Sequence, residues 1–308
     1  MTGRDASIIP LVRPTWLPKR VWPFETFGLE VDGSTLAVTD VGRGPVLLLV
    51  HVGAWSFIWR DLISRLATDF RCICFDAPGN GRTVDGAGIS INLDTAARAV
   101  RGVIEGLDLD DVTLVAHDLG GIAGLGAFAR KPERLRGIVA VNAFAWTPQT
   151  PLRIMLAIVG NPLMRELDVL TGIIPRISAT SFGVGRNLDE PARQAFLDGM
   201  GSRGRRAFHN YLRDARRSDQ LYDEIARALS GPLSTLPLLT IFGEHNDPFH
   251  FQQQWKALFP ECRQVVLANG NHFPMCDDPD LVAQSIRSWH REWVAAANGE
   301  QAGKVQAI

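Results

Sequence analysis

The sequence predicts an α/β protein in which helices cover both faces of a mostly parallel sheet, with a helical cap inserted between two strands. Short apolar runs of strand length alternate with segments of helical length, as in parallel α/β folds. The run Val46–Val50 is apolar at every position, which is typical of a strand buried on both faces. Between residues 146 and 229 the alternation stops and only helix-like sequence follows, which indicates the cap.

The elements can be placed in order along the chain. The proline-rich start is expected to form an extended arm on the surface. Asp32-Gly33 joins two short segments, 27–31 and 34–39, and a two-residue Asp-Gly connection favours a β-hairpin. The other predicted strands are 45–50, 72–75, 112–116, 137–141, 236–242 and 264–267. The predicted core helices are 59–68, 93–107, 122–130, 251–259 and 281–297.

The length of 308 residues fits one large domain that carries an insertion. Hydrophobic residues make up 46% and charged residues 21% of the chain, which is ordinary for a globular protein. The predicted division is an N-terminal arm at 1–25, a core at 26–145 and 230–297, the cap at 146–229 and a flexible tail at 298–308.

The charge balance limits the partners that the chain can attract. It has 32 Lys and Arg and 33 Asp and Glu, so its net charge is −1 and it offers no basic field for nucleic acid or anionic lipid. No apolar run reaches the roughly 18 residues that cross a bilayer, and the charged start is no signal peptide. We therefore expect a cytoplasmic protein without nucleic-acid or membrane partners, and the sequence leaves a homodimer open.

The sequence predicts no cofactor and no metal. Its four cysteines lack any Cys-x-x-Cys spacing, and no group of His, Cys and Asp has the spacing of metal ligands. Gly79-Asn80-Gly81 follows a predicted strand, but it lacks the third glycine and the helix start of a phosphate-binding loop.

The clearest catalytic signal is the segment VTLVAHDLGG at residues 112–121. A buried strand runs into a tight turn and then into a glycine-rich helix start, which is the order of a nucleophile elbow. Asp118 stands at the centre of the turn. A carboxylate nucleophile attacks an sp³ carbon and forms an alkyl ester, whereas a serine would attack an acyl carbon.

Two further residues complete a predicted triad. Asp247 follows the strand 236–242 and His272 follows the last predicted strand, so the chain order is nucleophile, acid, histidine. In this arrangement His272 activates a water that hydrolyses the ester, and Asp247 fixes the tautomer of His272. Backbone N–H groups of Gly53 and Leu119 are the predicted oxyanion hole.

Each member of the triad also has a structural interpretation. Asp118 fits an ordinary turn aspartate, Asp247 fits a helix N-cap, and His272 fits a surface histidine. The succession of a strand, a central aspartate, a Gly-Gly pair and a matching histidine loop favours the catalytic interpretation of Asp118.

These motifs resemble those of α/β-hydrolases with an aspartate nucleophile, namely haloalkane dehalogenases and epoxide hydrolases. The resemblance rests on WSFIWR at 55–60, DAPGNG at 76–81, HDLGG at 117–121 and HFPMCDDP at 272–279. It implies an α/β-hydrolase fold, a small apolar organic substrate, water as the second reactant, and cleavage of a carbon–halogen bond as in the dehalogenases.

The chain departs from both families where they bind the leaving group. Haloalkane dehalogenases generally place Trp after the nucleophile and Asn in the loop before it as halide donors; here these positions hold Leu119 and the sequence HVGA at 51–54. Epoxide hydrolases use cap tyrosines as proton donors, and this chain has only two tyrosines. The candidate pocket residues or proton donors are Trp55, Asn142, Trp146, His209 and Tyr211.

Several functions therefore remain open. Dehalogenase-like hydrolysis is the first expectation. Opening of an epoxide or a β-lactone is the alternative, because these substrates keep their leaving oxygen and need no halide site. An ester or C–C hydrolase with Asp118 as a base, or a hydrolase fold that only binds a ligand, would form no covalent alkyl intermediate.

Overall fold

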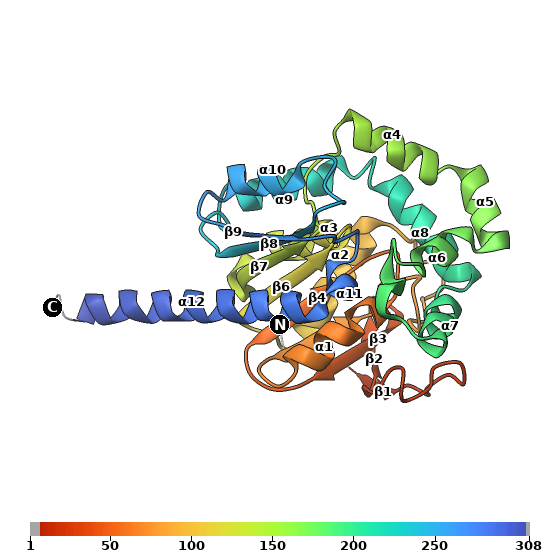
Figure 1. The fold of residues 1–308 in the computed structure, drawn as a ribbon, viewed down its shortest axis with the longest axis horizontal. Helices are drawn as coiled ribbons and strands as arrows, with labels where there is room; N and C mark the ends of the chain where they lie inside the picture. The colour runs from red at the N-terminus through yellow and green to blue at the C-terminus, as the bar shows by residue number, and fades with distance from the viewer. Residues whose placement is uncertain (1–6, 306–308) are drawn as a thin grey trace.

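The computed structural model describes residues 7–305, which form a nine-stranded sheet in the order β1-β2-β3-β5-β4-β6-β7-β8-β9 (Figure 1). The pairs β1–β2, β2–β3 and β3–β5 are antiparallel, and every other pair is parallel. The predicted fold class, a mostly parallel α/β sheet flanked by helices, is confirmed. The strands are β1 (Ile8–Pro10), β2 (Phe27–Val31), β3 (Ser34–Val41), β4 (Val46–Val50), β5 (Arg71–Phe75), β6 (Val112–His117), β7 (Leu135–Val141), β8 (Leu238–Gly243) and β9 (Arg263–Leu267).

The hairpin of β2 and β3 forms as predicted. Asp32 and Gly33 both have positive φ, 49° and 78°, as a primed two-residue turn requires. The N-terminal arm differs from the expectation of a surface segment. Its residues Ile8–Pro10 form the edge strand β1, and Trp22 is fully buried beside Trp55.

Apolar side chains are buried on both faces of the sheet. Leu48 and Val50 of β4 belong to the core layer on one face, and Leu47 and Leu49 belong to the layer on the other. Strict alternation of this kind explains why the whole run is apolar. The helices outside residues 146–218 are α1 (Arg60–Leu66), α2 (Leu93–Gly106), α3 (Gly120–Ala129), α9 (Asp219–Leu229), α10 (Phe251–Leu258), α11 (Pro274–Asp277) and α12 (Pro279–Val305), with short 3₁₀ helices η1 (Ser56–Trp59) and η2 (Pro132–Arg134).

Between β7 and β8 the chain forms helices alone. Figure 1 shows α4 to α8 beside one end of the sheet, with α4 and α5 outermost. The helix α9, which the sequence groups with the cap, packs against α3 of the core layer. The elements of this insertion before α9 are α4 (Thr150–Val159), α5 (Pro162–Thr171), α6 (Ile173–Ser178), η3 (Val184–Asn187), α7 (Glu190–Gly199) and α8 (Ser202–Asp214).

The C-terminal helix extends further than the sequence predicts. Helix α12 continues to Val305 and projects from the body of the molecule (Figure 1), so most of the segment 298–308, which the sequence assigns to a tail, is helical. Residues 1–6 of the arm and 306–308 of the tail lie outside the described residues. Within the described part of the chain, no helix combines the length and the apolar character needed to cross a membrane.

Candidate active site

The turn between β6 and α3 holds Asp118 in a strained conformation. Its φ of 50° lies in the left-handed region, which few residues with a side chain adopt. The turn is possible because α3 begins with Gly120: a Cβ there would lie 2.1 Å from the carbonyl oxygen of Val50. The local sequence therefore produces the predicted elbow, with its central side chain presented at the carboxyl end of the sheet.

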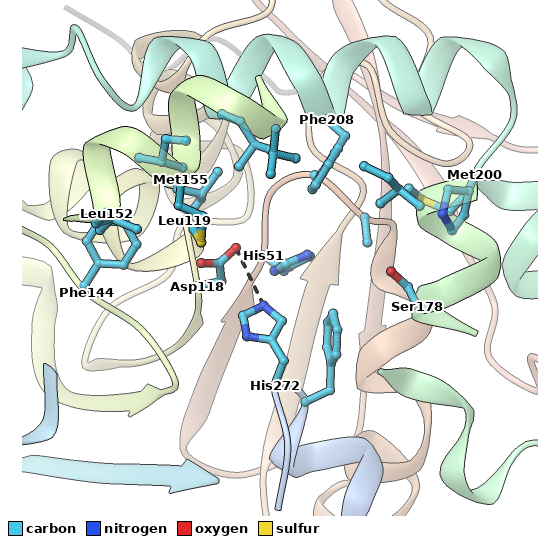
Figure 2. Close-up of a pocket in the computed structure, with 18 of the residues that line it drawn as sticks. His51, Asp118, Leu119, Phe144, Leu152, Met155, Ser178, Met200, Phe208 and His272 are labelled. Carbon is cyan, nitrogen blue, oxygen red and sulfur yellow. Dashed lines mark ion pairs between the residues drawn. The ribbon is translucent and has the colours of Figure 1, made fainter. Parts of the chain in front are cut away.

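Asp118 faces His272, as predicted. The Asp118 Oδ2 and His272 Nε2 atoms are 3.9 Å apart, and Figure 2 shows the two side chains pointing toward one another. Burial raises the pKa of Asp118, and this effect outweighs the opposing influence of His272 and of the Leu119 N–H on the carboxylate. A carboxylate that is poorly stabilised in this way has the chemistry of a candidate nucleophile.

The partner of His272 is Asn246, not Asp247. His272 Nδ1 lies 2.8 Å from Asn246 Oδ1. Asp247 turns instead to the first turn of α10, where its carboxylate accepts the N–H groups of Phe251 at 2.7 Å and Gln252 at 3.0 Å. The expected contact of Asp247 with His272 is therefore wrong, because the unsatisfied N–H groups at the helix start hold this carboxylate.

A buried amide, Asn142, fixes the orientation of this pair. Its Oδ1 accepts the N–H of Gly243 at 3.0 Å, so its Nδ2 must face the acceptors around it. These are the carbonyl oxygens of Asn271 and His272, both at 2.9 Å, and Asn246 Oδ1 at 3.3 Å. Asn246 Oδ1 is thereby an acceptor, so in the neutral form of His272 the proton lies on Nδ1 and the lone pair of Nε2 faces Asp118.

Of the two predicted oxyanion-hole donors, the N–H of Leu119 is available and the N–H of Gly53 is not. The N–H of Leu119 interacts with the Asp118 carboxylate. The N–H of Gly53 does not reach it, because it donates to Asn80 Oδ1 at 3.1 Å. The next residue, Ala54, also lines the cavity, and among the described residues no acceptor takes its N–H. Ala54 replaces Gly53 as the second candidate donor.

A cavity of about 260 Å³ opens over Asp118. Most of its wall is apolar, and the polar side chains that line it are those of His51, Asp118, Ser178 and His272. Ser178, at the end of α6, had no sequence signal as a site residue. The apolar lining comes from Leu119, Phe144, Leu152, Met155, Leu156, Val159, Ile174, Pro175, Phe196, Met200, Phe208, Leu212 and Phe273 (Figure 2 draws most of the wall).

Two of the expected proton donors are occupied elsewhere. Trp55 Nε1 donates to the carbonyl of Phe196 at 3.2 Å. The hydroxyl of Tyr211 donates to the carbonyl of Pro78 at 2.6 Å, and burial raises its pKa well above the ordinary value. Both side chains are fully buried and neither lines the cavity. The expectation that they contact the substrate is wrong.

The other three expected contacts also lie outside the cavity wall. His209 is buried within the cap, between the carbonyl of Val159 at 2.8 Å and Asp168 Oδ2 at 3.2 Å. Trp146 packs edge to face on Trp255, and Asn142 holds the histidine loop. The sequence could not show this, because each of these side chains is turned away from Asp118 by contacts made far along the chain.

Two neutral histidines lie beneath the site. His117 Nε2 is 2.7 Å from the carbonyl of His272, and its Nδ1 is 3.0 Å from Nδ1 of His51. Burial lowers the pKa of His51 to about 3 and that of His117 well below its ordinary value, so both rings are neutral. A carbonyl only accepts, so His117 carries its proton on Nε2 and accepts from His51 Nδ1–H.

This relay determines what His51 offers to the cavity. With its proton on Nδ1, His51 has a lone pair on Nε2, and the residue lines the cavity beside Asp118 (Figure 2). His51 therefore presents a hydrogen-bond acceptor to the cavity, not a donor. Among the side chains that the structure describes, residues 7–294, no three of His, Cys, Asp or Glu gather in a way that could hold a metal.

Comparison with known proteins places this geometry in a family. A model of the alpha/beta hydrolase family matches residues 47–285. Haloalkane dehalogenase 2 of Mycobacterium tuberculosis is 26% identical over 277 residues, which cover 87% of this chain and 95% of that protein. The cis-3-alkyl-4-alkyloxetan-2-one decarboxylase of Shewanella oneidensis is 27% identical over 290 residues, or 88% of this chain and 89% of that protein.

The solved structures agree with the fold. Haloalkane dehalogenase DbeA from Bradyrhizobium elkani matches with a TM-score of 0.76 at 21% identity, over 89% of this chain and 99% of that chain. The range of the family match includes Asp118, Asn246 and His272. As the elbow and the histidine loop predict, the chain belongs to the alpha/beta hydrolase family.

Proposed function

We propose that this hydrolase forms an alkyl ester between Asp118 and an sp³ carbon of a small apolar substrate, and then hydrolyses it. One observation carries the proposal. The strained elbow presents Asp118 to an apolar cavity, with His272 Nε2 at 3.9 Å from Asp118 Oδ2. A carboxylate in such a place lacks strong hydrogen bonds that would blunt its attack.

The reaction has two steps. In the first, a carboxylate oxygen of Asp118 forms a bond to the substrate carbon, and the leaving group departs with the electron pair. In the second, His272 Nε2 takes a proton from water while the water oxygen attacks the ester carbonyl of Asp118. We propose that the oxyanion that forms there accepts from the N–H groups of Leu119 and Ala54. As it collapses, His272 returns its proton to the leaving alkoxide, which departs as the alcohol, and the carboxylic acid left on Asp118 loses its proton to solvent.

The walls of the cavity favour a leaving group that stays attached to the substrate. A free halide needs donors, and the cavity offers an acceptor at His51 and an apolar side chain at Leu119. An epoxide or β-lactone has strain to drive its opening and keeps its leaving oxygen. The similarity to an oxetan-2-one decarboxylase supports a β-lactone in particular, since an oxetan-2-one is a β-lactone. Dehalogenation is the second candidate, and the similarity to a haloalkane dehalogenase supports it.

The covalent intermediate provides the test. The variant His272→Ala is incubated separately with an aryl epoxide, a β-lactone and a bromoalkane, and the intact protein is weighed by mass spectrometry. We expect a stable adduct that maps to Asp118 with a strained-ring probe. The matched control His272→Ala/Asp118→Asn should form none.

The outcomes separate the alternatives. An adduct with the bromoalkane alone would make dehalogenation the function. If no probe labels the folded variant, Asp118 is a base or the chain only binds its ligand, and the proposal is wrong. A cytoplasmic location and a homodimer stay predictions.

A further inference from the structure

The outer helices of the cap carry large apolar side chains in solvent. We call these residues the cap ridge: Ile158 of α4, Leu163, Leu167 and Leu170 of α5, Ile177 of α6 and Phe182. The leucines of α5 follow a spacing of four and three residues, so they share one face of the helix. Leu163 is 77%, Leu170 is 83% and Phe182 is 75% exposed. On soluble proteins, large exposed apolar side chains that gather in one region commonly mark an interaction site.

The cap ridge borders the entrance of the active-site cavity. Met155 of α4 lines the cavity and is also 43% exposed, and it lies one helical turn before Ile158 of the cap ridge. On α6, Pro175 and Ser178 line the cavity, whereas Ile173 and Ile177 are exposed on the outer side. The same two helices thus present one face to the substrate and another to whatever covers the cap ridge.

The charge around the cap ridge has one prevailing sign. Residues 150–217 contain eleven arginines and six acidic residues, whereas the rest of the chain has 21 basic and 27 acidic residues. The net charge of −1, from which no lipid partner was expected, hides this separation. Arg205 and Arg176 lie within about 4 Å of the site of a Cβ on Gly172, at the junction of α5 and α6.

Two of these arginines make their hydrogen bonds to backbone carbonyls and not to carboxylates. Arg205 donates to the carbonyls of Met200 and Val169. Arg153, at the start of α4, donates to the carbonyl of Arg216. A carbonyl orients a guanidinium without cancelling its charge. The exposed Arg153 therefore stays available to an anionic partner, and the half-buried Arg205 adds positive charge behind it.

From these observations we propose that the cap ridge docks on an anionic lipid surface. The apolar side chains enter the boundary between headgroups and acyl chains, and the arginines around them contact lipid phosphates. A second copy of the chain is disfavoured, because two cationic caps would face each other. The entrance of the cavity then opens against the lipid, from which an apolar substrate passes directly to Asp118; this last point rests on the proposed function.

Vesicle flotation tests the docking without any substrate. The protein is mixed with vesicles of phosphatidylcholine, alone or with phosphatidylglycerol, and the bound fraction is measured. We expect binding to the mixed vesicles that weakens as salt is raised. The variant Leu163→Ser/Leu170→Ser should bind at least about tenfold more weakly, since each substitution removes an apolar side chain that would be buried in the lipid.

A matched variant and a second measurement make the result decisive. The control Val84→Ser/Val266→Ser alters two exposed apolar residues that lie outside the cap, and it should bind like the parent protein. Equal binding by both variants, or no flotation with either vesicle, overturns the proposal. Light scattering that shows a dimer, lost in the leucine variant, would make the cap ridge an interface between copies. Because Asp118→Asn should also float, failure of the proposed chemistry leaves this test intact.

Discussion

The substitution Asn246→Asp isolates the one feature in which this site differs from a charged triad. Asn246 Oδ1 already accepts the proton of His272 Nδ1 at 2.8 Å, and Asn142 holds the amide in that orientation. The tautomer of His272 is therefore correct without a carboxylate. What the amide does not supply is a negative charge to stabilise the imidazolium that forms when His272 takes a proton from water.

The size of the effect follows from this distance. A hydrogen bond of 2.8 Å puts a new carboxylate charge about 4 Å from the centre of the ring, where the attraction is about 4 kcal/mol at an effective dielectric constant of about 20. Asn246 is half-buried, so desolvation of the new carboxylate offsets part of this gain. We take about 2 kcal/mol as the net effect, which predicts ester hydrolysis roughly 30-fold faster.

The assay is a single-turnover measurement. Enzyme is alkylated with a limiting amount of the probe that labels His272→Ala, and the loss of the Asp118 adduct is followed by rapid quench and mass spectrometry. Alkylation itself should change little, because His272 takes no proton in that step. Asn246→Leu, which removes the acceptor, should slow hydrolysis. An unchanged rate in folded Asn246→Asp would refute the role assigned to the Asn246–His272 pair.

Four other outcomes follow from the same geometry. Asp247→Ala should lower the free energy of unfolding by about 1 kcal/mol through loss of the α10 cap and leave ester hydrolysis unchanged, as thermal unfolding and the same assay would show. The alkylation rate should fall with decreasing pH at a higher pH than for an ordinary carboxyl of pKa about 3.9, because the pKa of Asp118 is raised and only its carboxylate attacks; a midpoint near 3.9 would contradict this. Burial raises the pKa of Asp118 in the folded state, so stability declines as pH rises from the unfolded to the folded pKa; Asp118→Asn should therefore raise the midpoint of thermal unfolding at pH 7. Leu119→Trp should add an indole N–H to the cavity and increase turnover of a bromoalkane about tenfold; no gain would mean that the missing donor does not limit dehalogenation.

Local sequence was sufficient for most of the fold. The strands β4 and β6 are buried along both faces, and their sequences show it: β4 is apolar at every position, and β6 is apolar except at Thr113 and His117. The edge strand β1 could not be predicted, because it has three residues, ends in Pro10 and depends on its pairing with β2. Helix α12 continues beyond Ala297 through a polar stretch in which the sequence shows no apolar periodicity.

Some residues of the candidate site could be located from local sequence, and others could not. Asp118 and His272 could be located because each lies in a motif whose local order fixes its conformation. The choice between Asn246 and Asp247 could not be made, since these residues are adjacent in one loop and its backbone decides which of them meets His272. The relay from His51 through His117 depends on hydrogen-bond partners more than 60 residues apart in the chain.

Several groups around Asp118 carry no charge, and this affects both steps of the proposed reaction. His51 and His117 are neutral, because burial lowers their pKa values, and the partner of His272 is the amide of Asn246 where a carboxylate was expected. With little positive charge to stabilise it, the carboxylate of Asp118 gains reactivity toward an sp³ carbon. The same neutrality leaves the imidazolium of His272 without a counter-charge when water attacks the ester. The arrangement thus favours formation of the covalent ester over its hydrolysis, and it suits substrates whose ring strain makes the first step irreversible.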